Sequence, residues 1–207
     1  MAPPTAVPAL HLRAARASDA AALDDVCVRT GDAGGDARPR FAHPELLADI
    51  WLRPYLLLSP DLAWVVAGPD DVPVGYVLGA ADTAAFEDAC EEHWWPALRE
   101  RFPRGSVPAD SPDAGLVQLL HEPRREAADV VAAYPAHLHV DLLPEAQGGG
   151  WGRALLERLF DALRERGVPG VHLGVSSRNA NARAFYEHLG FEVLEEDDGG
   201  ALLGLRL

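Results

Sequence analysis

The residues with the clearest chemical potential form a glycine-rich turn between an apolar run and an amphipathic run. The apolar run covers residues 136–143, helical periodicity starts at Arg153, and between them stands Gln147-Gly148-Gly149-Gly150-Trp151-Gly152. A strand followed by such a turn at a helix N-terminus can bind an anion, because the first N–H groups of a helix have no intrahelical acceptors and the helix dipole adds positive potential. Glycine also lets the backbone approach a ligand closely. The turn therefore predicts a pyrophosphate site for a phosphate-bearing cofactor.

Two other phosphate motifs can be tested against this spacing. A Walker A loop requires a lysine, and the chain contains none. A dinucleotide-binding fingerprint lies early in a βαβ unit and has an acidic residue about 20 residues later, on the next strand. Here the spacing is Gln147-x-x-Gly150-x-Gly152 in the last third of the chain, and the next predicted strand, 171–175, holds no carboxylate. Neither motif fits.

The turn and a second motif resemble the GCN5-related N-acetyltransferase (GNAT) family. The acetyl-coenzyme A signature of that family, [Gln/Arg]-x-x-Gly-x-[Gly/Ala] after a strand, is matched by Gln147, Gly150 and Gly152. Residues 179–191 read Asn-Ala-Asn-Ala-Arg-Ala-Phe-Tyr-Glu-His-Leu-Gly-Phe, which is similar to the family's second signature, Asn-x-x-Ala-x-x-[Leu/Phe]-Tyr-Glu-x-x-Gly-Phe. The resemblance is tight over 136–194. Residues 137–191 look particularly like the acetyltransferase-like domain of O-GlcNAcases and its free-standing bacterial relatives.

This resemblance implies acetyl-coenzyme A as a cosubstrate, no metal, and direct transfer of an acetyl group to a primary amine. The cysteines fit that expectation, because neither Cys27 nor Cys90 has metal-ligand spacing or a reactive-looking setting. Both are expected to be buried free thiols, and no covalent enzyme intermediate is expected. The acceptor amine is not identified by either motif. A small molecule is slightly favoured over a peptide.

The resemblance also assigns cofactor-binding roles to residues of both motifs and of the preceding strand. Leu142 and Leu143 would offer backbone groups to the pantetheine arm, which would pair with the strand as a further strand does. The expected cofactor-binding residues are Leu142, Leu143, Gln147, Gly148, Gly149, Gly150, Trp151, Gly152, Arg153, Asn179, Ala182, Phe185 and Tyr186.

Four of these residues have alternative roles that the sequence leaves open. Trp151 is expected to pack on the first turn of its helix rather than stack on adenine. Arg153 can contact a phosphate or remain a solvated side chain. Asn179 can cap its helix as well as contact the cofactor arm, and Tyr186 can be a core residue with a satisfied hydroxyl.

The expected catalytic residues are Tyr186, Asp141 and His139. Tyr186 matches the family tyrosine that protonates the departing thiolate. The acceptor amine must lose a proton before it attacks, so a base is needed nearby. His137, His139 and Asp141 alternate along one face of the strand at 136–143, which indicates a face that looks into the acceptor site. We expect Asp141 or His139 to be the base, provided that no strand irregularity exchanges the two faces.

The predicted fold is that of the family, an α/β (α+β) domain with a mixed, mostly antiparallel sheet of about seven strands flanked by helices. One domain is expected over 10–207, after a disordered lead-in at 1–9. Strands are predicted at 10–14, 62–67, 74–79, 136–143, 171–175, 191–194 and 201–207, and helices at 21–29, 44–51, 84–101, 116–121, 153–166 and 179–189. Residues 83–134 exceed the short turn usual between the third and fourth strands, so they are expected to form a helical insertion that either acts as a lid or extends the core.

Composition narrows the partners and the compartment. The net charge of −14 disfavours nucleic acid and anionic membranes, and it favours a cationic acceptor. No apolar stretch reaches the roughly 20 residues of a membrane span. The N-terminus lacks the positive region of a signal peptide, so a cytoplasmic location is expected. A homodimer is left open.

One rival function uses the same fold without the chemistry. The chain could be a non-catalytic module that binds the cofactor or another protein. Acetylation of a protein N-terminus or lysine would differ from the favoured function only in the acceptor.

Overall fold

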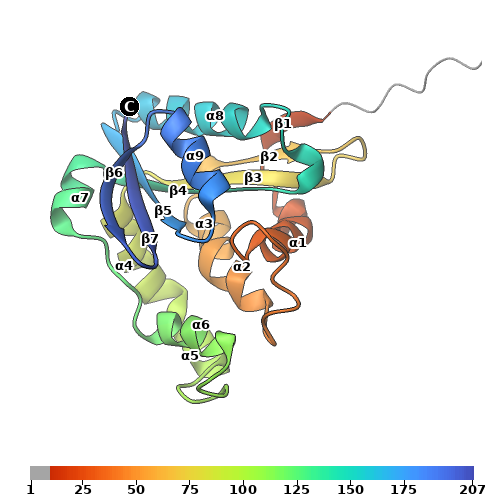
Figure 1. Ribbon diagram of the computed structural model, residues 1–207, viewed down its shortest axis with the longest axis vertical. Coiled ribbons are helices and arrows are strands. Elements are labelled where there is room, and N and C mark those ends of the chain that lie inside the picture. The colour runs from red at the N-terminus through yellow and green to blue at the C-terminus, as the bar shows by residue number, and fades with distance from the viewer. Residues whose placement is uncertain (1–9) are drawn as a thin grey trace, which may run out of the picture.

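The computed structural model describes residues 10–207, so the lead-in expected at 1–9 lies outside the described residues. Seven strands form one sheet in the order β1-β2-β3-β4-β5-β7-β6 (Figure 1). Every neighbouring pair is antiparallel except β4 and β5, which are parallel. The predicted mixed, mostly antiparallel sheet flanked by helices is confirmed.

The strands and helices have the following bounds. The strands are β1 (His11–Ala14), β2 (Ala63–Ala67), β3 (Pro73–Ala80), β4 (Ala136–Leu142), β5 (Gly170–Ser176), β6 (Glu192–Asp197) and β7 (Gly200–Arg206). The helices are α1 (Ala20–Thr30), α2 (Glu45–Trp51), α3 (Arg53–Leu58), α4 (Thr83–His93), α5 (Trp95–Arg101), α6 (Pro112–His121), α7 (Ala128–Ala133), α8 (Trp151–Glu165) and α9 (Ala180–His188).

The sheet separates two apolar cores because side chains alternate between its faces. On β3, Tyr76 and Leu78 belong to the core beneath α1–α6, whereas Val77 belongs to the core beneath α8 and α9. Helix α8 carries one apolar stripe, and its leucines are fully buried against the sheet. The same alternation on β4 sets which side chains face each layer.

Three helical features differ from the prediction. The helix expected at 84–101 is two helices, α4 and α5, which are separated at Trp94. Pro96 explains the break, because proline has no N–H and its ring clashes with the preceding turn of a helix. Helix α3 was not expected, and Pro54 stands in its first turn. Helix α7 was not expected either.

The long connection between β3 and β4 contains α4, α5, α6 and α7. In Figure 1, α4 leads away from the sheet to α5 and α6 at one end of the molecule, and α7 returns toward the sheet. This connection is the helical segment that the sequence indicated. Its role as a lid stays a prediction.

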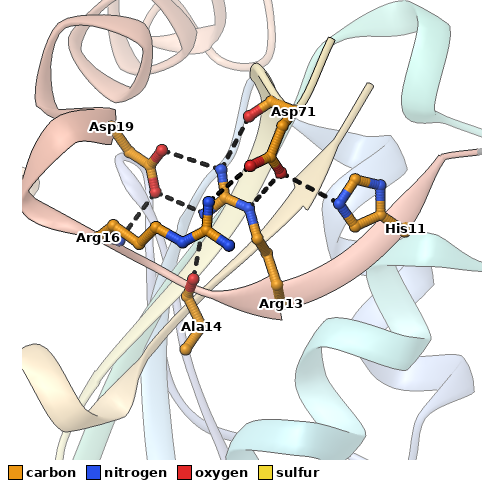
Figure 2. A network of polar contacts seen from close by, with 6 residues as sticks. All are labelled: His11, Arg13, Ala14, Arg16, Asp19 and Asp71. Atoms are coloured by element: carbon orange, nitrogen blue, oxygen red, sulfur yellow. Dashed lines mark hydrogen bonds and ion pairs between the residues drawn. The ribbon is translucent and has the colours of Figure 1, made fainter. Parts of the chain in front are cut away.

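A polar network fixes the first strand to the turn between β2 and β3 (Figure 2). The Arg13 guanidinium donates to both carboxylate oxygens of Asp19, at 2.7 and 2.9 Å, and to the Asp71 carboxylate at 2.6 Å. Arg16 donates to the other Asp71 oxygen at 2.5 Å, and His11 lies 3.1 Å from Asp71. In the part of the chain that the structure describes, no helix is long and apolar enough to cross a bilayer.

Candidate active site

Strands β4 and β5 diverge almost as soon as they pair. Their ladder contains only two pairs, Ala136 with Val171 and His137 with His172, although both strands continue beyond them. On its other edge β4 pairs with β3 without interruption, from Ala80–His137 to Gly75–Leu142. From Leu138 onward, β4 therefore has an edge that β5 does not cover. We call this opening the β4–β5 split.

The hydrogen-bond alternation of β4 decides which backbone groups face the split. The Leu143 N–H donates to the Val74 carbonyl at 2.9 Å, so Leu143 and every second residue before it direct their backbone groups toward β3. The alternate residues beyond the last pair with β5, Val140 and Leu142, then direct their backbone groups into the split. The Leu142 carbonyl accepts from the side-chain amide of Gln147 at 2.9 Å, which leaves the Leu142 N–H for a ligand.

In this geometry the backbone of Leu143 is occupied by internal hydrogen bonds, whereas the backbone of Val140 is open. Leu143 was expected to offer backbone groups, but its N–H is bonded to Val74 and its carbonyl accepts from Ala146 at 2.9 Å. It is also buried. Val140 was not predicted, and its backbone faces the split two residues before Leu142. The register with β3, which sequence alone does not supply, makes this distinction.

The glycine-rich turn leaves a row of N–H groups without acceptors. Across residues 10–207, neither backbone nor side-chain atoms accept from the N–H groups of 148–153, and the first bonded amide of the helix is Ala154, which donates to Gly150 at 3.0 Å. Gly148 and Gly150 have positive φ, 74° and 80°, which glycine adopts without strain. A Cβ at either position would meet no atom within 4 Å. The turn is open to a ligand.

Other residues of the first motif pack rather than open outward. A Cβ on Gly152 would lie 3.1 Å from the Phe185 ring and 3.5 Å from the Leu142 side chain, so Gly152 lets α8 approach α9 and β4. Trp151 packs against the core beneath α8 and α9. Arg153 is half-exposed and lies 3.6 Å from Glu157.

The second motif places a capping residue and a buried tyrosine on α9. The Asn179 Oδ1 accepts from the Ala182 N–H at 3.1 Å, so Asn179 caps the helix. The Tyr186 ring is buried, and its hydroxyl has no hydrogen-bond partner among the described residues. No fully buried polar side-chain atom in the described chain lacks a partner, so this hydroxyl reaches accessible space. Burial, and to a smaller extent the Asp141 charge, raises the pKa of Tyr186, which keeps the phenol protonated at neutral pH.

His137, His139 and Asp141 lie on one face of β4, as the alternation predicted, and no irregularity interrupts that strand. His137 is fully bonded: its Nδ1 lies 2.8 Å from the Thr83 hydroxyl, and its Nε2 lies 2.7 Å from the Tyr55 hydroxyl. Thr83 already donates to the Pro135 carbonyl, so it accepts from the Nδ1–H of His137. Burial lowers the pKa of His137, so the ring is neutral and its Nε2 accepts from Tyr55. His137 therefore supports the site and has no free nitrogen for catalysis.

His139 and Asp141 have different surroundings. The His139 ring lies 5.2 Å from the Tyr55 ring, and among the described residues neither of its nitrogens has a hydrogen-bond partner. Burial lowers the pKa of His139 to about 4, so the ring is neutral at pH 7. Asp141 accepts from the Tyr76 hydroxyl at 2.6 Å. Burial raises the pKa of Asp141, and the hydrogen bonds from Tyr76 and Thr30 oppose that rise.

A pocket of about 800 Å³ opens on this face of the sheet, between the start of the split and the β3–β4 connection. Its walls are aromatic and histidine rings, with several carboxylates and two arginines at the side of the connection. The lining residues include Trp51, Tyr55, Phe86, Glu87, Trp95, Glu122, Arg124, Arg125, Glu126, His137, His139 and His172. Three residues of the site, Tyr55, Tyr76 and Thr83, were not predicted, because they come from other elements and carry no motif.

The fold, with its glycine-rich turn beside the β4–β5 split, is that expected of an acetyltransferase, and a family model agrees. The chain matches the acetyltransferase (GNAT) family over residues 35–191 and belongs to that family. The predicted family is thereby confirmed. The narrower resemblance to the O-GlcNAcase domain stays a prediction.

Solved structures extend the comparison over nearly the whole chain. The structure described as SsHAT has a TM-score of 0.90 and 45% identity, and the match covers 96% of this chain and 98% of that one. The yncA protein of Salmonella typhimurium, solved with acetyl-CoA, has a TM-score of 0.56 and 19% identity over 96% and 94% of the two chains. At that identity the second likeness shows the fold alone.

The curated relatives are acetyltransferases that are named for different acceptors. Mycothiol acetyltransferase of Nocardiopsis dassonvillei is 32% identical over 162 residues, 75% of this chain and 46% of that protein. The ribosomal protein bS18-alanine N-acetyltransferase of Escherichia coli K12 is 54% identical over 48 residues, 23% of this chain and 32% of that protein. These matches span less than half the length of the curated relatives.

Proposed function

We propose that this chain transfers the acetyl group of acetyl-coenzyme A directly to a primary amine. The observation that carries the proposal is the row of N–H groups at 148–153 without acceptors, next to the open edge of β4. A diphosphate fits such a row, and an amide-containing arm fits a strand edge. The name of the Escherichia coli relative, an alanine N-acetyltransferase, supports transfer to an amine.

The residues of the first motif and of β4 would hold the cosubstrate. The amides of 148–153 bind the diphosphate, and the backbone groups of Val140 and Leu142 bind the arm. When bound, the thioester supplies an activated acetyl group. Gly152 matters indirectly, because it lets the Phe185 ring and the Leu142 side chain pack close to the start of α8.

Three proton transfers accompany the reaction. The protonated acceptor gives one proton to a base, His139 or Asp141, directly or through water. The amine nitrogen then forms a bond to the acetyl carbon while the carbon–sulfur bond breaks. Tyr186 donates its phenolic proton to the departing thiolate, which is a poor leaving group without a donor. The acetylated nitrogen then releases its remaining extra proton, which converts the Tyr186 phenolate back to the phenol. His139 lines the pocket, whereas Asp141 lies farther along the same face, beside Tyr76.

The acceptor is proposed to be a small cationic amine. The pocket has aromatic walls, and carboxylates outnumber guanidinium groups among its lining residues. Helix α4, from the β3–β4 connection, supplies Phe86 and Glu87 to its wall, which suits a lid over a small molecule better than an open groove for a protein. The homodimer stays a prediction that sedimentation velocity would test.

The test compares substitutions of two glycines at opposite ends of α8. Gly150 and Gly167 both have positive φ and open space at Cβ, so aspartate strains both alike. Acetyl-CoA should raise the melting temperature of the wild type and of Gly167→Asp. It should not stabilise Gly150→Asp, because the new carboxylate repels a diphosphate. Gly150→Asn, with similar strain and no charge, should retain part of the effect. Equal stabilisation of Gly150→Asp would overturn the assigned site.

Turnover distinguishes the proposed enzyme from the non-catalytic alternative. An enzyme should release coenzyme A thiol with at least one member of an amine panel, and Tyr186→Phe should lower that rate roughly a hundredfold without weakening cosubstrate stabilisation. Cosubstrate binding without thiol release for any amine would favour a binding module.

A further inference from the structure

Among residues 10–207, the Nε2 of His172, which faces the pocket, has no hydrogen-bond partner. The residue is only 3% exposed, and it lines the pocket where the β4–β5 ladder ends. Its Nδ1 lies 2.7 Å from the Tyr134 carbonyl. A carbonyl can only accept, so Nδ1 carries a hydrogen and donates it. In the neutral ring, Nε2 is therefore an acceptor.

The Glu126 carboxylate, which can only accept hydrogen bonds, lies close to the Nε2 of His172. The Glu126 carboxylate lies 3.8 Å from His172 Nε2, beyond hydrogen-bonding distance. Because no fully buried polar atom of residues 10–207 is left without a partner, Nε2 must be accessible from the pocket. Two acceptors thus face each other across a space that a donor nitrogen can bridge.

In the described chain, no arginine lies within ion-pairing distance of Glu126. Arg125 pairs with Asp88 at 2.7 Å and lies 4.0 Å from Glu87, and across the described chain the only ion-pairing contact of Glu126 is with His172. Glu87 accepts from the Glu126 backbone N–H at 3.2 Å, so the two acidic residues are held together. Burial raises the pKa of Glu87, a sign that this corner is partly withdrawn from water.

We propose that His172 and Glu126 form a subsite for a second ammonium group of the acceptor, so that the preferred acceptor is a diamine. This inference rests on the proposed function for the identity of the reacting amine. An ammonium donates one hydrogen to Nε2 and another to the Glu126 carboxylate, and Glu87 adds negative potential. The other amine is then directed toward His139 at the split.

The sheet geometry sets the spacing between the two amines. His172 pairs with His137, and His139 stands two residues farther along β4. Two residues along a strand and one strand spacing give about 8 Å between the Cα atoms of His139 and His172. An extended diamine with about five methylenes spans such a distance, given carbon–carbon bonds of about 1.5 Å. Cadaverine is a suitable probe, and n-hexylamine is its monoamine counterpart of equal length.

Calorimetry on the full chain, with and without coenzyme A, measures the affinity for both amines. Cadaverine should bind at least tenfold more tightly than n-hexylamine. Glu126→Gln should weaken cadaverine binding roughly tenfold to a hundredfold, as expected for loss of a charge-assisted hydrogen bond. It should change n-hexylamine binding less than twofold. Glu92→Gln removes an exposed charge from the same connection and should leave the preference unchanged.

Nitrogen NMR of His172 provides a readout that needs no variant. Cadaverine should shift the Nε2 resonance of His172, while n-hexylamine should not. Equal affinity for the two amines overturns the subsite. So does an imidazolium resonance in the free protein, because His172 and Glu126 would then be a self-contained ion pair.

Thiol release separates this inference from the proposed function. Coenzyme A released equally fast with n-hexylamine and cadaverine would uphold acetyl transfer and reject the subsite. Selective cadaverine binding without thiol release would uphold the subsite and reject transfer.

Discussion

At the scale of single residues, the two candidate bases are distinguished by what holds each of them. Among the described residues His139 has no hydrogen-bond partner, and burial lowers its pKa to about 4. Two opposing effects act on the pKa of Asp141: burial raises it, and the hydrogen bond from the Tyr76 hydroxyl at 2.6 Å lowers it. A histidine whose pKa is lowered is a weaker base than an ordinary imidazole, whereas a carboxylate whose pKa is raised is a stronger base than an ordinary carboxylate.

Tyr76→Phe tests this distinction through the pH profile of kcat/KM. Removing the hydroxyl takes away a hydrogen bond to the charged form of Asp141, so the pKa of Asp141 rises further. If Asp141 is the base, the rising limb of the profile moves to higher pH. Tyr134→Phe, whose hydroxyl is remote from Asp141, is the control. An unmoved limb in Tyr76→Phe would assign the base to His139 instead.

At the scale of elements, the site depends on how tightly α8 packs on the sheet. Gly79 of β3 lies beneath α8, and a Cβ there would stand 2.7 Å from a methyl carbon of Leu159. Leu159 is completely buried, so it cannot move aside into solvent. Glycine at this position is therefore a packing requirement, although a glycine inside a strand otherwise weakens it.

Gly79→Ala should lower the free energy of unfolding by about 1–3 kcal/mol, the usual cost of overpacking a core. Urea denaturation measures the change. The control is Gly174→Ala on β5, where a Cβ would meet nothing within 4 Å. That substitution should be neutral or slightly stabilising. Equal destabilisation by both would mean that strand conformation, and not contact with α8, determines the cost.

At the scale of the whole molecule, the ion network of Figure 2 ties the first strand to the turn between β2 and β3. The Arg13 and Arg16 guanidinium groups, with His11, lower the pKa of Asp71 to about 2 from its ordinary 3.8. A carboxyl whose pKa is lower in the folded protein stabilises the fold above the unfolded pKa. That contribution is lost as the pH falls from about 4 through 2.

Asp71→Asn should therefore lower the urea midpoint at pH 7, and its difference from the wild type should shrink toward zero near pH 2. Chemical denaturation followed by circular dichroism across this range measures both effects. The neighbouring Asp70, which is exposed and forms no ion pair in the described chain, supplies the control Asp70→Asn. A difference that persists unchanged at pH 2 would contradict the linkage.

Much of the fold was predictable because its signals are local. The glycine turn, the leucine stripe of α8 and the alternation of His137, His139 and Asp141 each depend on neighbours within a few residues. Local pattern was misleading where proline intervened: Pro96 divides the helix expected at 84–101, and Pro54 starts a helix that was not expected. Both errors follow from backbone chemistry that the hydrophobic periodicity conceals.

By itself, the amino-acid sequence determined the family, the position of the glycine-rich turn and which face of β4 carries its titratable groups, because helix and strand periods impose those properties on consecutive residues. The tertiary structure alone decided where β4 and β5 separate, that Val140 rather than Leu143 faces the split, and that His172 lies opposite Glu126. These features depend on strand register and on contacts between segments far apart in the chain. Such contacts leave no periodic signal in one sequence.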